Sequence, residues 1–233
     1  MADGWKKSLQ ELFFPITTCV ACGQKADNDG LCDMCRERIK SARRCPRCAA
    51  FLSDEATDCS LCHMHEKLPF SKAVAALPYE GKLRMMLRNY KYYNQPWLSY
   101  PFAEMLSVAL ADYNLLDFVL VTVPLFADKE EKRGYNQAQL LAQLLGKKHH
   151  IPCMTQCIER IVDTPPLYSL NRRQRIDMLA KAFAPGRQSV SGRKILLIDD
   201  IFTTGSTCLA CSKMMLASGA KEIMVAAVAA TKL

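Results

Sequence analysis

The sequence has no apolar run long enough to cross a membrane. A spanning helix needs about 20 consecutive apolar residues, and the longest run here, residues 223–230, is far shorter. The N-terminus carries Lys6 and Lys7, but the following LQELFFP is too short and too polar for a secretory signal peptide. These absences predict a cytoplasmic protein without membrane insertion.

Acidic residues are also fewer than basic residues. The chain has 23 Asp and Glu against 31 Lys and Arg, for a formal net charge of +8. Residues 128–187 hold 11 basic and 6 acidic side chains, whereas residues 1–70 hold 10 of each. Such a surface favours anionic ligands, nucleic acid included. With 233 residues, of which 50% are hydrophobic, the chain can bury a substantial core in one or two domains.

The most informative segment is residues 195–208, which read ILLIDDIFTTGSTC. Its four leading apolar residues predict a buried parallel strand, and the apolar periodicity from residue 208 predicts a helix. Between them, backbone N–H groups, hydroxyls and the helix N-terminus would face a phosphate, which the glycine lets approach closely. The residues predicted to bind the phosphate are Thr203, Thr204, Gly205, Ser206 and Thr207, and Asp199 and Asp200 lie beside them, placed to hold vicinal sugar hydroxyls or a magnesium ion.

This segment resembles the 5-phosphoribosyl-1-pyrophosphate (PRPP) loop of type I phosphoribosyltransferases, in which four apolar residues precede two acids and a Thr/Gly-rich turn. The resemblance implies that Asp199 and Asp200, the candidate catalytic residues, hold ribose hydroxyls or a magnesium ion. In such sheets the loop after an early strand wraps the pyrophosphate end of the ligand. Residues 124–137 occupy that place and offer Lys129, Lys132 and Arg133. The polar, basic segment 163–186 is expected to form a lid.

Eight of the 12 cysteines form four CxxC pairs between residues 19 and 62. Each pair can bind one ion through both thiolates, and four thiolates complete a tetrahedral structural zinc site. Eight ligands therefore predict two structural zinc ions with no open position for catalysis. Consecutive pairing joins Cys19, Cys22, Cys32 and Cys35 in one site and Cys45, Cys48, Cys59 and Cys62 in the other. An interleaved cross-brace is the open alternative.

Two stretches carry the chemistry of nucleic-acid binding. The cysteine-rich segment holds a basic cluster that is compatible with phosphate-backbone contacts and equally with a solvated rim. The stretch RNYKYYNQPW mixes cations with rings that can stack the bases of a single strand, although such aromatic residues also pack in cores. The candidate contacts are Arg36, Arg38, Lys40, Arg43, Arg44, Arg47, Lys91, Tyr92 and Tyr93.

Several segments together resemble the ComF family of competence proteins, also called the ComFC or GntX group. LFFPITTCVACG resembles the opening of the family, KRGYNQAQLLA resembles its RGFNQA…LA signature, and DDIFTTGST completes the match. The resemblance implies an α/β fold of the phosphoribosyltransferase type, a Rossmann-like parallel sheet flanked by helices, over residues 69–233. A double zinc-ribbon module over residues 1–68 would precede it.

The same resemblance implies binding of PRPP with magnesium and a role in natural transformation, in which the protein handles incoming single-stranded DNA. Its partners would include a DNA translocase and recombination or primosome proteins, which would bring it to the inner face of the membrane. The sequence offers no recognisable acceptor site. Two interpretations therefore compete: a DNA-uptake factor whose PRPP site senses a ligand, and an active phosphoribosyltransferase with an unidentified acceptor.

Overall fold

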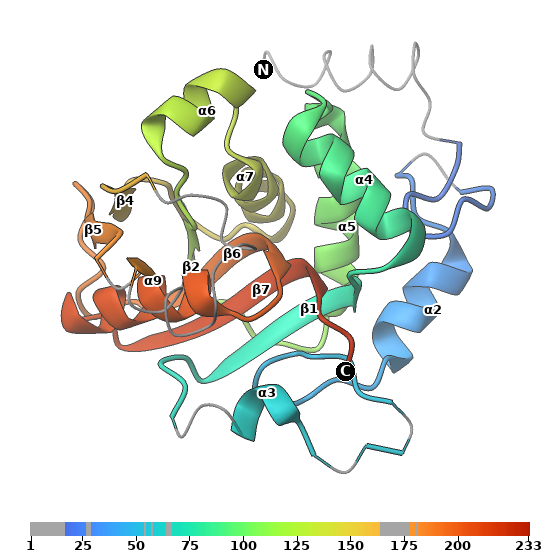
Figure 1. Cartoon of the computed structure of the whole chain (residues 1–233), viewed down its shortest axis with the longest axis horizontal. Coiled ribbons are helices and arrows are strands. Elements are labelled where there is room, and N and C mark those ends of the chain that lie inside the picture. Colours follow the sequence, from blue (N-terminus) through green and yellow to red (C-terminus); the bar gives the residue numbers. More distant parts are fainter. Residues whose placement is uncertain are drawn as a thin grey trace.

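A five-stranded parallel sheet forms the centre of the protein, in the order β1-β7-β6-β2-β3 (Figure 1). The computed structural model describes residues 17–26, 29–53, 55–56, 58–63, 67–163, 178–179 and 181–233. The strands are β1 (Lys72–Pro78), β2 (Phe118–Thr122), β3 (Cys153–Met154), β6 (Lys194–Phe202) and β7 (Glu222–Ala230).

The strand sequences explain why this sheet is buried on both faces. All of β2 is buried, as is β7 apart from its first residue. Near-continuous apolar runs of this kind are typical of parallel strands covered by helices on both sides. Because successive side chains point to opposite faces, Leu196 and Ile198 join one apolar cluster while Ile195 and Leu197 join the other.

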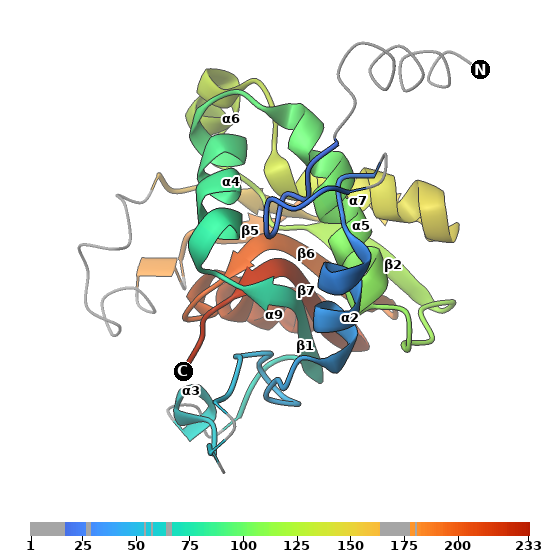
Figure 2. The same cartoon turned by 90° about the vertical axis from the view of Figure 1, so that its right-hand side faces the viewer.

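Helices cover each face of the sheet. α5 (Ser99–Ala109) and α7 (Gln137–His149) pack on one face with α4 (Gly81–Tyr92), and α9 (Ser206–Ala217) covers the other (Figures 1 and 2). The 3-10 helix η1 (Pro96–Leu98) links α4 to α5, and α6 (Ala127–Arg133) precedes α7. β4 (Ile158–Arg160) and β5 (Phe183–Pro185) form a separate antiparallel pair, and β5 contacts α9.

The cysteine-rich segment packs on both sides of the edge strand β1. α2 (Asp33–Ser41) and the first four cysteines join the apolar cluster of the α5 face, whereas the last four, which include one on α3 (Ser60–His63), join that of the α9 face. Between the two groups the chain follows β1. The Ala73 N–H donates to the Arg47 carbonyl oxygen at 2.9 Å, and the Arg44 guanidinium donates to the Ala76 carbonyl oxygen at 3.0 Å. These bonds satisfy backbone groups that an edge strand would otherwise expose.

The predicted α/β architecture, a parallel sheet flanked by helices with an N-terminal cysteine module, is confirmed. The division into residues 1–68 and 69–233 stays a prediction. The strand predicted at residues 195–198 continues through both acids to Phe202, because β7 pairs with it as far as Ala230. No helix in the described ranges has the length and apolar character needed to cross a membrane.

Two expectations about connecting segments have different outcomes. The predicted loop at residues 124–137 contains α6, whose acidic first turn and basic last turn complement the helix dipole. Gly134, with φ 76°, ends this helix in the left-handed conformation. Of the expected lid, residues 164–177 and residue 180 lie outside the described residues.

Candidate phosphate-binding site and cysteine clusters

The Thr/Gly/Ser loop joins the C-terminal end of β6 to the N-terminus of α9. In open α/β sheets, ligands bind at this carboxyl edge of the strands. Within the described part of the chain, no group accepts a hydrogen bond from the backbone N–H groups of residues 203–208. The hydroxyls of Thr204 and Ser206 are hydrogen-bonded to each other at 2.9 Å. The loop therefore offers unpaired amide donors at the positive end of a 12-residue helix.

Gly205 is required at the turn for two separate reasons. Its φ is 70°, a left-handed conformation that side chains rarely adopt. A Cβ atom placed on it would lie 2.5 Å from Cζ of Phe202, which is too close for any real contact. The buried Phe202 ring therefore packs directly against the backbone of the loop and sets its shape.

The two acids lie in β6 just before this loop and differ in environment. Asp200 is 4% exposed; its Oδ1 lies 3.0 Å from Nζ of Lys91, and its buried Oδ2 has no hydrogen-bond partner among the described residues. Asp199 is half-buried, and its Oδ1 accepts a hydrogen bond from the Asp200 N–H at 2.8 Å. Burial, followed by the neighbouring Asp200 carboxylate, raises the pKa of Asp199 to about 7, although Lys91 opposes the shift.

A pocket of about 490 Å³ lies between the end of α4 and α6. It is lined by four cationic side chains, those of Lys91, Lys129, Lys132 and Arg133. Glu131, Tyr92, Asn94, Gly134 and Tyr135 complete the lining. The three cations predicted on the pyrophosphate side are therefore brought together, and Lys91, a predicted nucleic-acid contact, joins them. Because Lys91 also touches Asp200, the pocket adjoins the acid pair.

The residues of the GYNQ segment hold the walls of this pocket. Asn136 caps α7 by accepting from the Gln139 N–H, and its amide donates to the Val123 carbonyl oxygen beyond the end of β2. The Tyr90 hydroxyl donates to the Gln137 carbonyl oxygen at 2.9 Å, and the Gln137 amide donates back to the Tyr90 carbonyl oxygen. These bonds join α4 to α7, and so fix Lys91 relative to α6.

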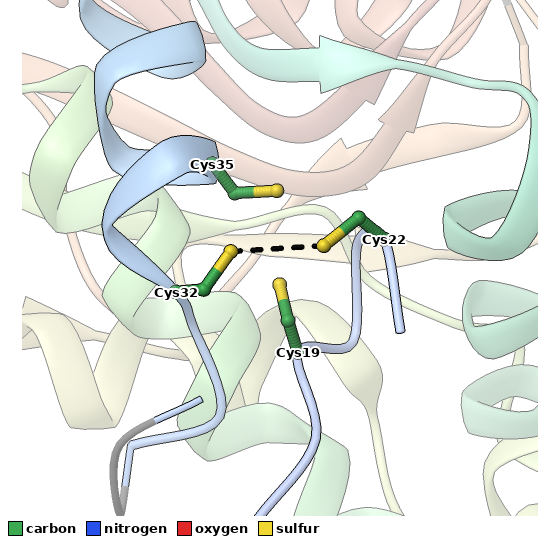
Figure 3. A group of neighbouring side chains, drawn as sticks. All are labelled: Cys19, Cys22, Cys32 and Cys35. Atoms are coloured by element: carbon green, nitrogen blue, oxygen red, sulfur yellow. Dashed lines mark hydrogen bonds between the residues drawn. The ribbon is translucent and has the colours of Figure 1, made fainter. Parts of the chain in front are cut away.

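The two cysteine groups have the consecutive pairing. Cys19, Cys22, Cys32 and Cys35 form one cluster, and Cys45, Cys48, Cys59 and Cys62 form the other, with all sulfurs of a cluster within 4.8 Å of one another. Figure 3 shows the four side chains of the first cluster pointing toward a common centre, where the sulfurs of Cys22 and Cys32 are 3.6 Å apart. Each cluster could hold one zinc ion with four thiolates.

The thiols of these clusters are not equivalent without a metal. Burial opposes ionisation of Cys19, but backbone N–H groups of Cys32, Cys22 and Ala21 outweigh it and lower its pKa to about 7. Burial and the neighbouring sulfurs raise the pKa of Cys35. A low-pKa thiolate beside thiols of raised pKa, such as that of Cys35, is a natural first ligand for a cation, whose charge then favours ionisation of those thiols.

The predicted nucleic-acid contacts differ in the protein contacts they already make. Arg36 pairs with Asp29 and Glu104, joining the first cysteine cluster to α5. Arg44 is half-buried, and Arg43 donates to two backbone carbonyl oxygens. Arg38, Lys40, Arg47, Tyr92 and Tyr93 are exposed, Lys40 beside Glu37. The role of the whole set in nucleic-acid binding stays a prediction.

Sequence reasoning missed the roles of two contributors to the site, Lys91 and Phe202. Lys91 stands in a basic aromatic stretch, and nothing in that stretch indicates that it contacts Asp200 on β6. Phe202 reads as one more apolar residue of the strand, yet its ring forms the support of Gly205. The position directly before the Thr/Gly turn is the single hint that Phe202 shapes the loop.

Comparison with known proteins agrees with the resemblance read from the motifs. No family model matches the chain. Competence protein F of Haemophilus influenzae is 31% identical over 204 residues, which cover 84% of this chain and 89% of that protein. DNA utilization protein YhgH of Escherichia coli O157:H7 is 25% identical, with coverages of 84% and 88%, and competence protein ComFC of Bacillus subtilis is 26% identical, with coverages of 82% and 80%.

Among solved structures, purine phosphoribosyltransferase from Pyrococcus horikoshii aligns with 60% of this chain and 75% of its own, with 17% identity and a TM-score of 0.31. The relationship to competence protein F spans most of both sequences. The chain therefore belongs to the ComF family of competence proteins.

Proposed function

We propose that this protein binds PRPP with magnesium at the β6–α9 loop and handles single-stranded DNA during DNA uptake. The observation that carries the first part is the meeting of three groups at one edge of the sheet. They are the unpaired amides after Thr203, the acid pair, and the cationic pocket. A ligand with a phosphate, a vicinal diol and a pyrophosphate matches these groups one by one.

Each part of the ligand has a physical counterpart. The loop amides, the hydroxyls of Thr203 and Thr207, and the positive end of α9 would bind the 5′-phosphate. Asp199 and Asp200 would accept hydrogen bonds from the ribose hydroxyls, and the buried Oδ2 of Asp200 has no other partner among the described residues. Lys129, Lys132 and Arg133 would neutralise the pyrophosphate. Magnesium, when bound with PRPP, supplies further neutralisation of that charge.

A working transferase is the second candidate function. The pocket beside Asp200 is lined by Tyr92, Asn94 and Tyr135 as well as by cations. Aromatic rings and an amide suit a planar nitrogen base that would attack C1 of the ribose as pyrophosphate leaves. A nucleobase, a nucleic-acid end and a nitrogenous metabolite all have this chemistry.

The test of PRPP binding is calorimetry with PRPP and magnesium on wild type and on the Asp199→Asn/Asp200→Asn variant. Replacing both acids by their neutral isosteres should weaken binding by at least about 100-fold, because the charge-assisted hydrogen bonds to the ribose and the attraction for magnesium are lost. Zinc content of the variant, measured in parallel, checks that the fold is retained. Equal PRPP affinity in the two proteins would show that the acid pair and its loop do not bind PRPP.

Turnover separates the sensor from the enzyme. Wild type is incubated with PRPP, magnesium and single-stranded DNA or free nucleobases, and pyrophosphate is measured. Release that depends on the acceptor favours the transferase. Tight PRPP binding without release favours a site in which the ligand controls conformation.

The DNA part of the proposal is supported by relatives named for competence and DNA utilization. The protein itself offers exposed cations at Arg38 and Arg47 and exposed rings at Tyr92 and Tyr93. In this proposal a DNA translocase and recombination or primosome proteins are partners, and they hold the protein at the inner face of the cytoplasmic membrane.

Charge reversal tests the DNA surface. Arg38→Glu with Arg47→Glu should weaken binding to a single-stranded oligonucleotide and reduce its salt slope by about 0.7 per lost phosphate contact. Lys213→Glu, an exposed change on α9, serves as the matched control. Identical salt slopes for wild type and both variants would assign Arg38 and Arg47 to a solvated rim.

A further inference from the structure

Lys91 lies between two sets of charges of opposite sign. Its Nζ atom is 3.0 Å from Oδ1 of Asp200, and its side chain is 24% exposed. On its other side it lines the pocket with Lys129, Lys132 and Arg133. A single ammonium group is thus shared by the acid pair and by the cationic pocket.

The protein holds Lys91 in this position firmly. Lys91 follows Tyr90, whose hydroxyl, carbonyl oxygen and ring are all engaged with α7 or with Tyr135. The backbone at the end of α4 is therefore fixed, while the four-carbon side chain of a lysine can redirect its ammonium by rotation about its own bonds. Burial opposes the charge of Lys91, but Asp200 and then Asp199 raise its pKa, so it remains an ammonium.

The acid pair needs this cation when no ligand is present. Asp200 is almost fully buried, and a buried carboxylate without a counter-charge is costly. Among the described residues, Lys91 is the ion-pair partner of Asp200. A divalent cation or a sugar diol that engages Asp200 would compete with the ammonium or take over part of its role.

We propose that Lys91 couples the two halves of the ligand site: it pairs with Asp200 in the empty protein and turns to the anion in the pocket when a divalent cation or sugar hydroxyls engage the acids. The inference rests on the proposed function and adds a positioning residue that determines specificity. A ligand that brings only an anion must draw Lys91 away from Asp200, and a cation alone must displace it. A magnesium complex of a sugar pyrophosphate carries both. Its cation neutralises Asp200 while its anion binds the released ammonium of Lys91, so neither charge is left without a partner.

This coupling predicts effects of opposite sign for two simple probes. Lys91→Met keeps the length and apolar stem of the side chain but removes the charge. The affinity of the acid pair for Mg²⁺ alone should rise about tenfold, since the competing cation is gone. The affinity of the pocket for inorganic pyrophosphate alone should fall about tenfold, since one of four cations is lost. A residue with a purely structural role would lower both affinities or neither.

Titration calorimetry measures both probes separately, in metal-free buffer without chelator so that the cysteine clusters keep their zinc. Lys132→Met is the matched control, because Lys132 lines the same pocket and has no ion pair with the acids in the described structure. It should weaken pyrophosphate binding and leave Mg²⁺ binding unchanged. If Lys91→Met does not fold, Lys91→Met/Asp200→Asn removes the unpaired carboxylate as well. Compared with Asp200→Asn alone, it should lose pyrophosphate affinity without any gain for Mg²⁺.

The outcomes separate this inference from the proposed function. Opposite shifts in Lys91→Met support the coupling even if wild type fails to bind PRPP, in which case the ligand assignment is wrong. Shifts of the same sign, an unchanged Mg²⁺ affinity, or a wild type that binds neither probe overturn the coupling. Wild type that binds PRPP with magnesium while Lys91→Met binds Mg²⁺ alone and pyrophosphate alone as tightly as wild type also overturns it, and the proposed function stands.

Discussion

The Tyr90 hydroxyl donates a hydrogen bond to the Gln137 carbonyl oxygen, 2.9 Å away, and joins the last turn of α4 to the first turn of α7. Tyr90 is fully buried, and its ring packs edge-on against Phe102 at 5.4 Å between centroids. This contact connects the GYNQ segment to the helix that carries Lys91. Residues that resemble a family signature thus act here as the support of the cationic pocket.

Loss of that hydroxyl should destabilise the protein slightly but measurably. Tyr90→Phe keeps the ring packing and removes one buried hydrogen bond, at a cost of about 1 kcal/mol in the free energy of unfolding. Urea unfolding followed by tyrosine fluorescence measures it. Tyr93→Phe, at a side chain that is 63% exposed, should change nothing. Equal stabilities for the two variants would mean that the α4–α7 bond contributes nothing net.

Gly205→Ala should lower the free energy of unfolding more than Gly192→Ala, although both glycines have the same backbone conformation. Gly205 and Gly192 both have φ 70°, but a Cβ on Gly192 meets nothing within 4 Å, whereas one on Gly205 lies 2.5 Å from the Phe202 ring. Gly192→Ala should cost about 1 kcal/mol in backbone strain. Gly205→Ala should cost about 1–3 kcal/mol more, because Phe202 must move. Thermal unfolding of both variants measures these costs. Equal losses of stability would show that the Phe202 ring moves aside without cost.

Removal of one cysteine of the second cluster should release one zinc ion and loosen the C-terminus. The Phe51 N–H donates to the Thr231 carbonyl oxygen and the Leu233 N–H donates to the Phe51 carbonyl oxygen, each at 2.9 Å. Cys45→Ser should therefore halve the zinc content from two ions to one and speed hydrogen exchange at Phe51 and Leu233. Cys157→Ser, outside both clusters, should retain both ions. A Cys45→Ser protein with two zinc ions per chain contradicts the assignment of ligands.

The stability of the protein should depend on pH through Asp199. Its pKa is about 7 in the folded protein and about 4 in an unfolded chain. A raised folded-state pKa means that the stabilisation is complete below about pH 4 and is lost as pH rises through about 7. The free energy of unfolding should thus fall between about pH 4 and pH 7 and level off by pH 8. Asp199→Asn should lack this decline; an identical pH profile in the variant would show that other groups cause it.

Local sequence patterns were sufficient for most of the fold. The apolar run that became the start of β6 predicts a buried parallel strand, the apolar periodicity from residue 208 predicts α9, and the family resemblance implies the rest of the sheet and its helices. Two pieces were not predictable in this way. β3 has only Cys153 and Met154, too short for any periodicity, and α6 buries no residue and so lacks an apolar stripe.

Residue types were enough to recognise the chemistry of the candidate site. They did not show which distant residues come together in it. The amides of residues 203–208 and the adjacent acids follow each other in the chain, so their proximity is local. For Lys91, by contrast, the sequence predicts only a candidate nucleic-acid contact. Its contact with Asp200 depends on α4 lying over the end of β6, and a buried helix stripe of Leu83, Leu87 and Tyr90 does not specify that placement.

Local spacing and periodicity were enough to predict the eight thiolates in CxxC pairs, the phosphate-loop motif and the buried strand before it, because each depends on neighbours within a few residues. The packing of the whole chain was needed to show that the cysteines cluster in consecutive fours on opposite faces of the sheet. The packing also brings Lys91 into contact with Asp200. Such contacts join side chains that close packing of the whole chain brings together, and no local spacing encodes them.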